Sequence, residues 1–125
     1  YGHQAGDDCV RAIVALIRQM ESDQIFCARY GGDEFVIIYS GMSAEEVCER
    51  AEKLRQDVMA LQIEQRYAEG SFGVTISQGI CHDIPSNGNK NWDFLHVADQ
   101  ALYRVKRRGR NRLCMTDIHG REIEV

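Results

Sequence analysis

Two adjacent carboxylates follow two glycines in the stretch RYGGDEF, residues 29–35. Neighbouring acids repel each other, and a divalent cation offsets that cost; carboxylate oxygens favour Mg²⁺ or Mn²⁺. Glycine can take positive φ and leaves space where a bulky ligand approaches the backbone. Asp33 and Glu34, preceded by Gly31 and Gly32, are therefore candidate ligands of a metal that accompanies phosphate. The same letters are also typical of a solvated hairpin tip.

A basic stretch is the second feature that could meet phosphate. Six of the 15 Lys and Arg residues lie within residues 104–112. Lys106 and Arg110 would project to one side if helical geometry continued through Gly109, and charged donors bind phosphate oxygens strongly. Alternatively, cations near a helix C-terminus only complement its dipole.

Asp7 is a third candidate, because it follows Gly6 where the first helix is expected to open. An Asp in that place either caps the helix or accepts hydrogen bonds from a guanine edge. We also expect Arg29 to pair within the strand or hairpin that carries it.

The bulk composition fits one domain covering residues 1–125. Hydrophobic content is 44%, and no apolar run approaches the roughly 18 residues that span a bilayer. A net charge of −4 argues against a nucleic-acid partner. The five scattered cysteines lack a C-x-x-C pair, which favours a reducing cytoplasm over a disulfide framework or a zinc site. We expect no membrane contact by this domain, although a membrane tether elsewhere in the full protein is compatible with this.

Hydrophobic periodicity predicts helices that end near Met20, run from Ser43 to about Gln62, and run from Asn91 to Gly109. Runs of β-branched and aromatic residues predict strands at 25–30, 35–39, 73–81 and 113–115. The first two strands form a hairpin with the acidic pair at its tip, and the tail 117–125 fits a hairpin or a disordered end. This order predicts an α/β sandwich with helices on an antiparallel or mixed sheet.

Together these residues resemble the GGDEF family, the diguanylate cyclase domain of bacterial signalling proteins. The resemblance runs nearly end to end, through blocks in the right order: YGHQAGD (1–7), RYGGDEF (29–35), TISQG (75–79), ADQALYRVK (98–106) and GRNR (109–112). It implies a nucleotidyl-cyclase or ferredoxin-like βαββαβ-type sheet, from which this chain lacks the first strand.

The resemblance implies that two GTP molecules, one on each protomer of a homodimer, condense to cyclic di-GMP with release of two pyrophosphates. Asp33 would bind the catalytic Mg²⁺ (or Mn²⁺) and help activate the attacking 3′-hydroxyl. Glu34 would be the second acidic member of the site.

Substrate-binding roles follow in the same way. Asp7 would hold the guanine edge, with His3 near the nucleotide. Lys106 and Arg110 would contact the terminal phosphates, and Gly31-Gly32 would make room for the triphosphate.

The sequence departs from the family at two places. Family members carry a preceding Asp-x-Asp-x-Phe-Lys-x-Ile-Asn-Asp strand with a further metal carboxylate, which this chain lacks, so we expect an N-terminally incomplete domain with little activity alone. The alternative is a non-catalytic module that binds nucleotide or dimerises to regulate an attached domain; a sensor or regulatory domain is expected in either case. The inhibitory Arg-x-x-Asp positions fall on Ser22 and Ile25, so no inhibitory product site is expected.

Overall fold

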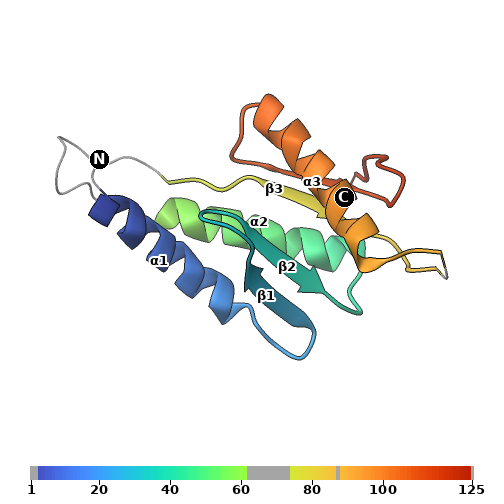
Figure 1. Ribbon diagram of the computed structural model, residues 1–125, viewed down its shortest axis with the longest axis horizontal. Helices are drawn as coiled ribbons and strands as arrows, with labels where there is room; N and C mark the ends of the chain where they lie inside the picture. The colour runs from blue at the N-terminus through green and yellow to red at the C-terminus, as the bar shows by residue number, and fades with distance from the viewer. Residues whose placement is uncertain (1–2, 62–73, 87, 125) are drawn as a thin grey trace. The chain divides into compact units, whose positions relative to one another are not determined.

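The computed structural model describes residues 3–61, 74–86 and 88–124. Its elements are, in order, α1 (His3–Gln19), β1 (Ile25–Arg29), β2 (Phe35–Tyr39), α2 (Ala44–Ala60), β3 (Gln78–Cys81), α3 (Asn91–Arg107) and β4 (Leu113–Thr116) (Figure 1). This mixture of helices and strands confirms the α/β prediction. The chain divides into two compact units, Tyr1–Ser43 with Gln56–Val74 and Ala44–Arg55 with Thr75–Val125.

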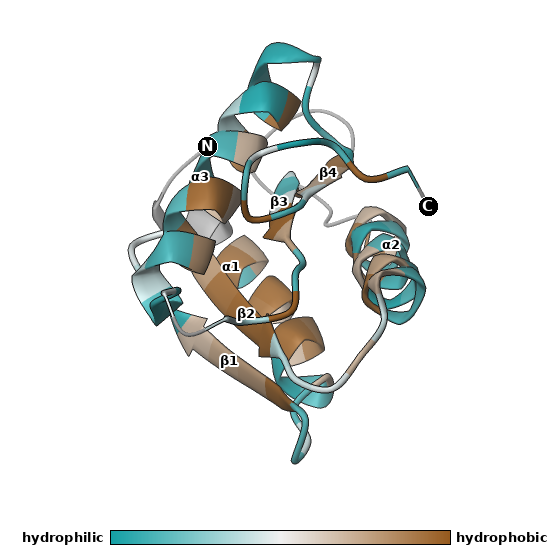
Figure 2. Ribbon diagram, turned by 90° about the vertical axis from the view of Figure 1, so that its right-hand side faces the viewer, coloured by the Kyte–Doolittle hydropathy of each residue, from teal (hydrophilic) through white to brown (hydrophobic). Residues whose placement is uncertain are grey.

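The first unit contains the predicted hairpin. β1 and β2 pair antiparallel from Ile25↔Tyr39 to Arg29↔Phe35. Ile25 is buried, whereas the next residue, Phe26, is 64% exposed, as the two-residue period of a strand requires. β1 is hydrophobic over most of its length (Figure 2). The hairpin therefore buries one face, and its tip carries the acidic pair.

α1 lies against this hairpin. Ile13 and Ile17 are its buried residues, and the thiol of Cys27 in β1 donates to the Ile17 carbonyl oxygen at 3.5 Å. The helix begins at His3, earlier than predicted. Asp7 consequently lies beyond the first turn and cannot be the N-cap, which removes the capping explanation for this residue.

The second unit joins a parallel strand pair to α3. The β3–β4 ladder runs from Gln78↔Leu113 to Cys81↔Thr116, and Ala101, Val105 and Cys114 form its buried cluster. The strand predicted at 73–81 is shorter than expected: residues 74–77 are irregular because the ladder with β4 starts only at Gln78, and residue 73 lies outside the described residues. In the described ranges the strands form two separate two-stranded sheets.

Of the two alternatives for the tail, a hairpin or a disordered end, the described residues form the hairpin. Thr116 bridges Glu122 antiparallel, and Gly120 makes the turn with a φ of +81°. The Ile123 N–H donates to the Met115 carbonyl oxygen at 2.8 Å, which adds this strand-like segment beside β4.

α2 follows Ser43 as predicted, and its apolar positions Val47, Ala51, Leu54 and Val58 are buried. The predicted end at Gln62 lies outside the described residues. Among the helices in the described ranges, none has the length and apolar character needed to cross a membrane.

Candidate functional site

The turn between β1 and β2 is closed by its backbone. The N–H groups of Tyr30 and Gly31 both donate to the Glu34 carbonyl oxygen, at 2.8 and 3.2 Å. Neither Gly31 nor Gly32 adopts the positive φ that glycine permits. Their contribution is space instead, since a Cβ built on Gly32 would meet no described atom within 4 Å.

Arg29 braces this turn from the end of β1. Its Nε donates to the carbonyl oxygens of Gly31 and Gly32 at 3.3 and 3.1 Å, and its Nη2 also donates to Gly32. The expected pairing of Arg29 within the hairpin is confirmed. Arg29 thereby holds the turn backbone directly before the acidic pair.

The carboxylates of Asp33 and Glu34 are both exposed and form no hydrogen bond or ion pair with the described residues. Their oxygen atoms therefore suit a hard divalent cation. Over residues 3–61, 74–86 and 88–124, however, no group of three or more His, Cys, Asp or Glu residues is arranged to hold a metal. The pair fits as part of a metal site and needs at least one further ligand.

The end of α3 differs from the helical continuation that we assumed. The helix ends at Arg107, Gly109 has a φ of +112°, and the Arg110 N–H donates to the Val105 carbonyl oxygen at 3.0 Å. This is a Schellman ending, so helical spacing does not align Lys106 with Arg110. Both side chains are exposed and unpaired toward the described residues.

The structure brings Asp33 and Glu34 together on one turn, with Gly31 and Gly32 beside them. Lys106 and Arg110 belong to the second unit. His3 and Asp7 lie in the first turns of α1, and their side chains are outside the described part of the chain.

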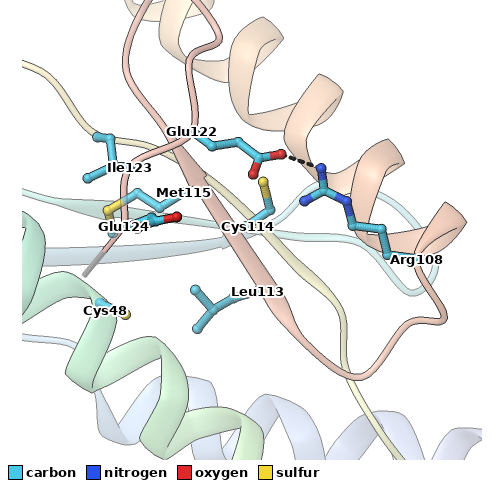
Figure 3. Close-up of a pocket in the computed structure, with 8 residues that line it drawn as sticks. All are labelled: Cys48, Arg108, Leu113, Cys114, Met115, Glu122, Ile123 and Glu124. Atoms are coloured by element: carbon cyan, nitrogen blue, oxygen red, sulfur yellow. Dashed lines mark hydrogen bonds and ion pairs between the residues drawn. The ribbon is translucent and has the colours of Figure 1, made fainter.

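A cavity of about 160 Å³ in the second unit does not include any predicted site residue (Figure 3). Cys48 and Cys114 lie on its wall, where Arg108 bonds to Glu122. Burial raises the pKa of the Cys114 thiol, which keeps it protonated and unreactive at neutral pH. The ion pair is already satisfied, which leaves Glu124 as the remaining charged residue of the lining.

Comparisons with known proteins identify the family of this chain. The family model described as "Diguanylate cyclase, GGDEF domain" matches residues 1–112. A diguanylate cyclase of Vibrio cholerae is 34% identical over 92% of this chain, and the chain spans only 34% of that relative's length.

Solved structures give the same result. The GGDEF domain of DgcB from Caulobacter crescentus, in complex with c-di-GMP, superposes with a TM-score of 0.83 and 32% identity over 95% of this chain and 68% of that one. The diguanylate cyclase SiaD from Pseudomonas aeruginosa, in complex with its activator SiaC, superposes with a TM-score of 0.79 and 26% identity over 93% and 43%. With its acidic turn, its helix ending and these matches, the chain belongs to the diguanylate cyclase GGDEF domain family.

Proposed function

We propose that this chain is the larger part of a diguanylate cyclase domain, which condenses two GTP molecules into cyclic di-GMP and two pyrophosphates in a homodimer that requires Mg²⁺ or Mn²⁺. The observation that carries the proposal is the braced turn that presents Asp33 and Glu34, whose carboxylates make no bond to the described residues. Membership of the family supports the reaction class.

Asp33 and Glu34 would hold the cation. When bound, the cation would offset the negative charge of the phosphates and favour ionisation of the attacking hydroxyl group. Asp33 would help to take the proton of the 3′-hydroxyl, and the open space at Gly32 would admit the triphosphate. Because Arg29 fixes the turn before substrate arrives, less reorganisation is needed during the reaction.

Charged donors would bind the rest of the nucleotide. Lys106 and Arg110 would contact the terminal phosphates through charge-assisted hydrogen bonds. Asp7 would accept from the guanine edge, with His3 nearby. Since Asp7 is not an N-cap, its carboxylate is not needed to satisfy the start of α1.

Two protomers would be needed because the 3′-hydroxyl of each nucleotide attacks the α-phosphate of the other. Dimerisation would supply the orientation that makes this attack effective. The SiaD–SiaC complex provides a precedent for control by a partner. We propose that an attached sensor or activator brings two copies of this domain together.

The complete domain, meaning this chain together with the metal-binding strand that we propose precedes it, provides the test. Asp33→Asn should lower the formation of cyclic di-GMP from GTP by about 100-fold or more, measured by chromatography with Mg²⁺ and with Mn²⁺. The matched control is Asp23→Asn, an exposed carboxylate of the same unit.

Equal activity of Asp33→Asn and the unmodified domain would contradict the proposed role of the turn. Nucleotide binding without any turnover in the unmodified domain would instead favour the non-catalytic module.

A further inference from the structure

Three consecutive residues after α3 have positive φ: Gly109 at 112°, Arg110 at 64° and Asn111 at 48°. Glycine adopts this region freely, whereas an arginine there is disfavoured by its Cβ. Among the described residues other than glycine, only Arg110 and Asn111 have positive φ. Such conformations persist where the surrounding structure enforces them, and they concentrate at functional sites.

Asn111 holds the loop at residues 109–111 in its backbone conformation. Its N–H donates to the Ser77 hydroxyl oxygen at 3.2 Å. Its carboxamide oxygen accepts from Nη1 of Arg55 at 3.1 Å, and its carbonyl oxygen lies 3.5 Å from the same nitrogen. The loop is thus tied both to the segment before β3 and to α2.

Arg55 is itself held in place. Its Nε donates to the carboxylate of Glu52 at 3.0 Å, and the side chain of Arg55 is only 19% exposed. The hydrogen bond to Glu52 raises the pKa of Arg55. One edge of the rigid guanidinium therefore binds Glu52 while Nη1 binds Asn111. The flexible ammonium group of lysine cannot make both contacts in this fixed geometry.

The backbone of Arg110 is held by hydrogen bonds, whereas its side chain makes none to the described residues. Its N–H donates to the Val105 carbonyl oxygen at 3.0 Å, and its own carbonyl oxygen accepts from Nε of Arg112 at 3.0 Å. Its guanidinium is exposed and makes no bond to the described residues. A Schellman ending needs only Gly109 in the left-handed region, so ending the helix does not explain the next two positive φ angles.

We propose that Asn111, held by Arg55 and Ser77, is a positioning residue that keeps Arg110 in the left-handed conformation from which its guanidinium binds the terminal phosphates of GTP. The inference rests on the proposed function, which assigns those phosphates to Arg110. Holding the loop before substrate arrives lowers the ordering cost of binding, so the benefit should appear in affinity.

The test uses the complete domain and calorimetry with two probes, an unreactive α,β-methylene analogue of GTP and GMP, each with Mg²⁺. Asn111→Gly keeps the positive φ accessible but removes the carboxamide. It should weaken binding of the triphosphate analogue by about 5–20-fold, as expected for partial loss of one charged phosphate contact, and leave GMP affinity unchanged, because GMP lacks the terminal phosphates.

Two further variants sharpen the result. Asn111→Asp keeps an oxygen that faces Arg55, and it should restore triphosphate affinity to within about twofold. Asn89→Gly is the matched control, because the carboxamide oxygen of Asn89 also accepts hydrogen bonds, in this case from the N–H and the hydroxyl of Ser86 at 3.0 and 2.8 Å. This control should change neither affinity.

Equal weakening for both probes, or no change with either, would overturn the inference. Arg110→Ala separates the two proposals: if it leaves triphosphate affinity unchanged, the phosphate role of Arg110 is wrong, and if it weakens that affinity while Asn111→Gly does not, only the positioning role is wrong. Should Asn111→Gly not fold, Arg55→Lys removes the same tie from the other side, with the same expected results.

Discussion

At the scale of single residues, Asp83 joins the end of β3 to the tail. Its carboxylate accepts from the N–H groups of Ile118 at 3.0 Å and Ile84 at 2.8 Å, and these two bonds lower the pKa of Asp83. A folded-state pKa below the unfolded one means that the carboxylate stabilises the fold above the unfolded pKa. That contribution is lost as the pH falls through the folded pKa.

We expect Asp83→Ala to lower the free energy of unfolding of the complete domain by about 1–2 kcal/mol at pH 7, since it leaves two N–H groups without their acceptor. The difference from the unmodified domain should begin to shrink once the pH falls below about 4, the pKa of an Asp in the unfolded chain, and should be lost as the pH falls through the lower pKa of the folded state. Urea denaturation at pH 7 and pH 3.5 measures both values, with Asp23→Ala as the exposed control. A difference that stays constant between the two pH values would contradict this assignment.

The residues of the acidic turn could be predicted from the sequence because everything that forms it is local. Tyr30 and Glu34 close the turn, and Arg29 is adjacent to it. The tie between Arg55 and Asn111 could not be predicted, because it joins residues 56 apart in the chain. No local pattern encodes the left-handed φ of Arg110, which the structure alone reveals.

At the scale of elements, Gly79 sets how closely β3 approaches α3. A Cβ at Gly79 would lie 2.2 Å from the backbone nitrogen of Leu102 and 2.3 Å from the carbonyl oxygen of Ala98. Both neighbours are backbone atoms of a helix and cannot rotate away. In the sequence, this glycine occupies an ordinary position in the alternating run 73–81, and the reason for it depends on a helix that follows later in the chain.

Gly79→Ala is expected to lower the free energy of unfolding of the complete domain by about 3 kcal/mol, the upper part of the range for overpacking, because α3 must shift. Gly88→Ala is the control, since a Cβ there would meet no described atom within 4 Å. Thermal and urea denaturation of both variants compare them directly. Unchanged stability of Gly79→Ala would show that the spacing between β3 and α3 is wider than described.

The helices illustrate which features of an element the sequence encodes well. The buried stripe of α2, from Val47 to Val58, follows the predicted 3.6-residue period. The length of β3 does not follow the alternation of residues 74–81, because a strand also needs a partner and β4 supplies one only from Gln78 onward. Periodicity thus predicts burial better than it predicts pairing.

At the scale of the whole molecule, the described strands form two separate pairs, β1 with β2 and β3 with β4. β2 and β3 each keep one edge that pairs with no other described strand, and unpaired edges favour aggregation. We propose, as above, that the complete domain also contains the metal-binding strand of the family. We propose that this strand contributes the carboxylate that the acidic turn lacks.

The last prediction follows from that proposal. The 125-residue chain alone should form cyclic di-GMP from GTP at least about 100-fold more slowly than the complete domain, because the proposed strand would supply a metal ligand and the orientation that this ligand gives to the phosphates. Parallel turnover assays at equal protein concentration, with sedimentation to record monomer, dimer and aggregate, make the comparison. The reference is the complete domain that carries Asp33→Asn. It contains the preceding strand but lacks one acidic ligand of the turn, so it should turn over GTP about as slowly as the short chain. Comparable rates for the short chain and the unmodified complete domain would mean that the turn and the helix ending suffice for the reaction without the preceding strand.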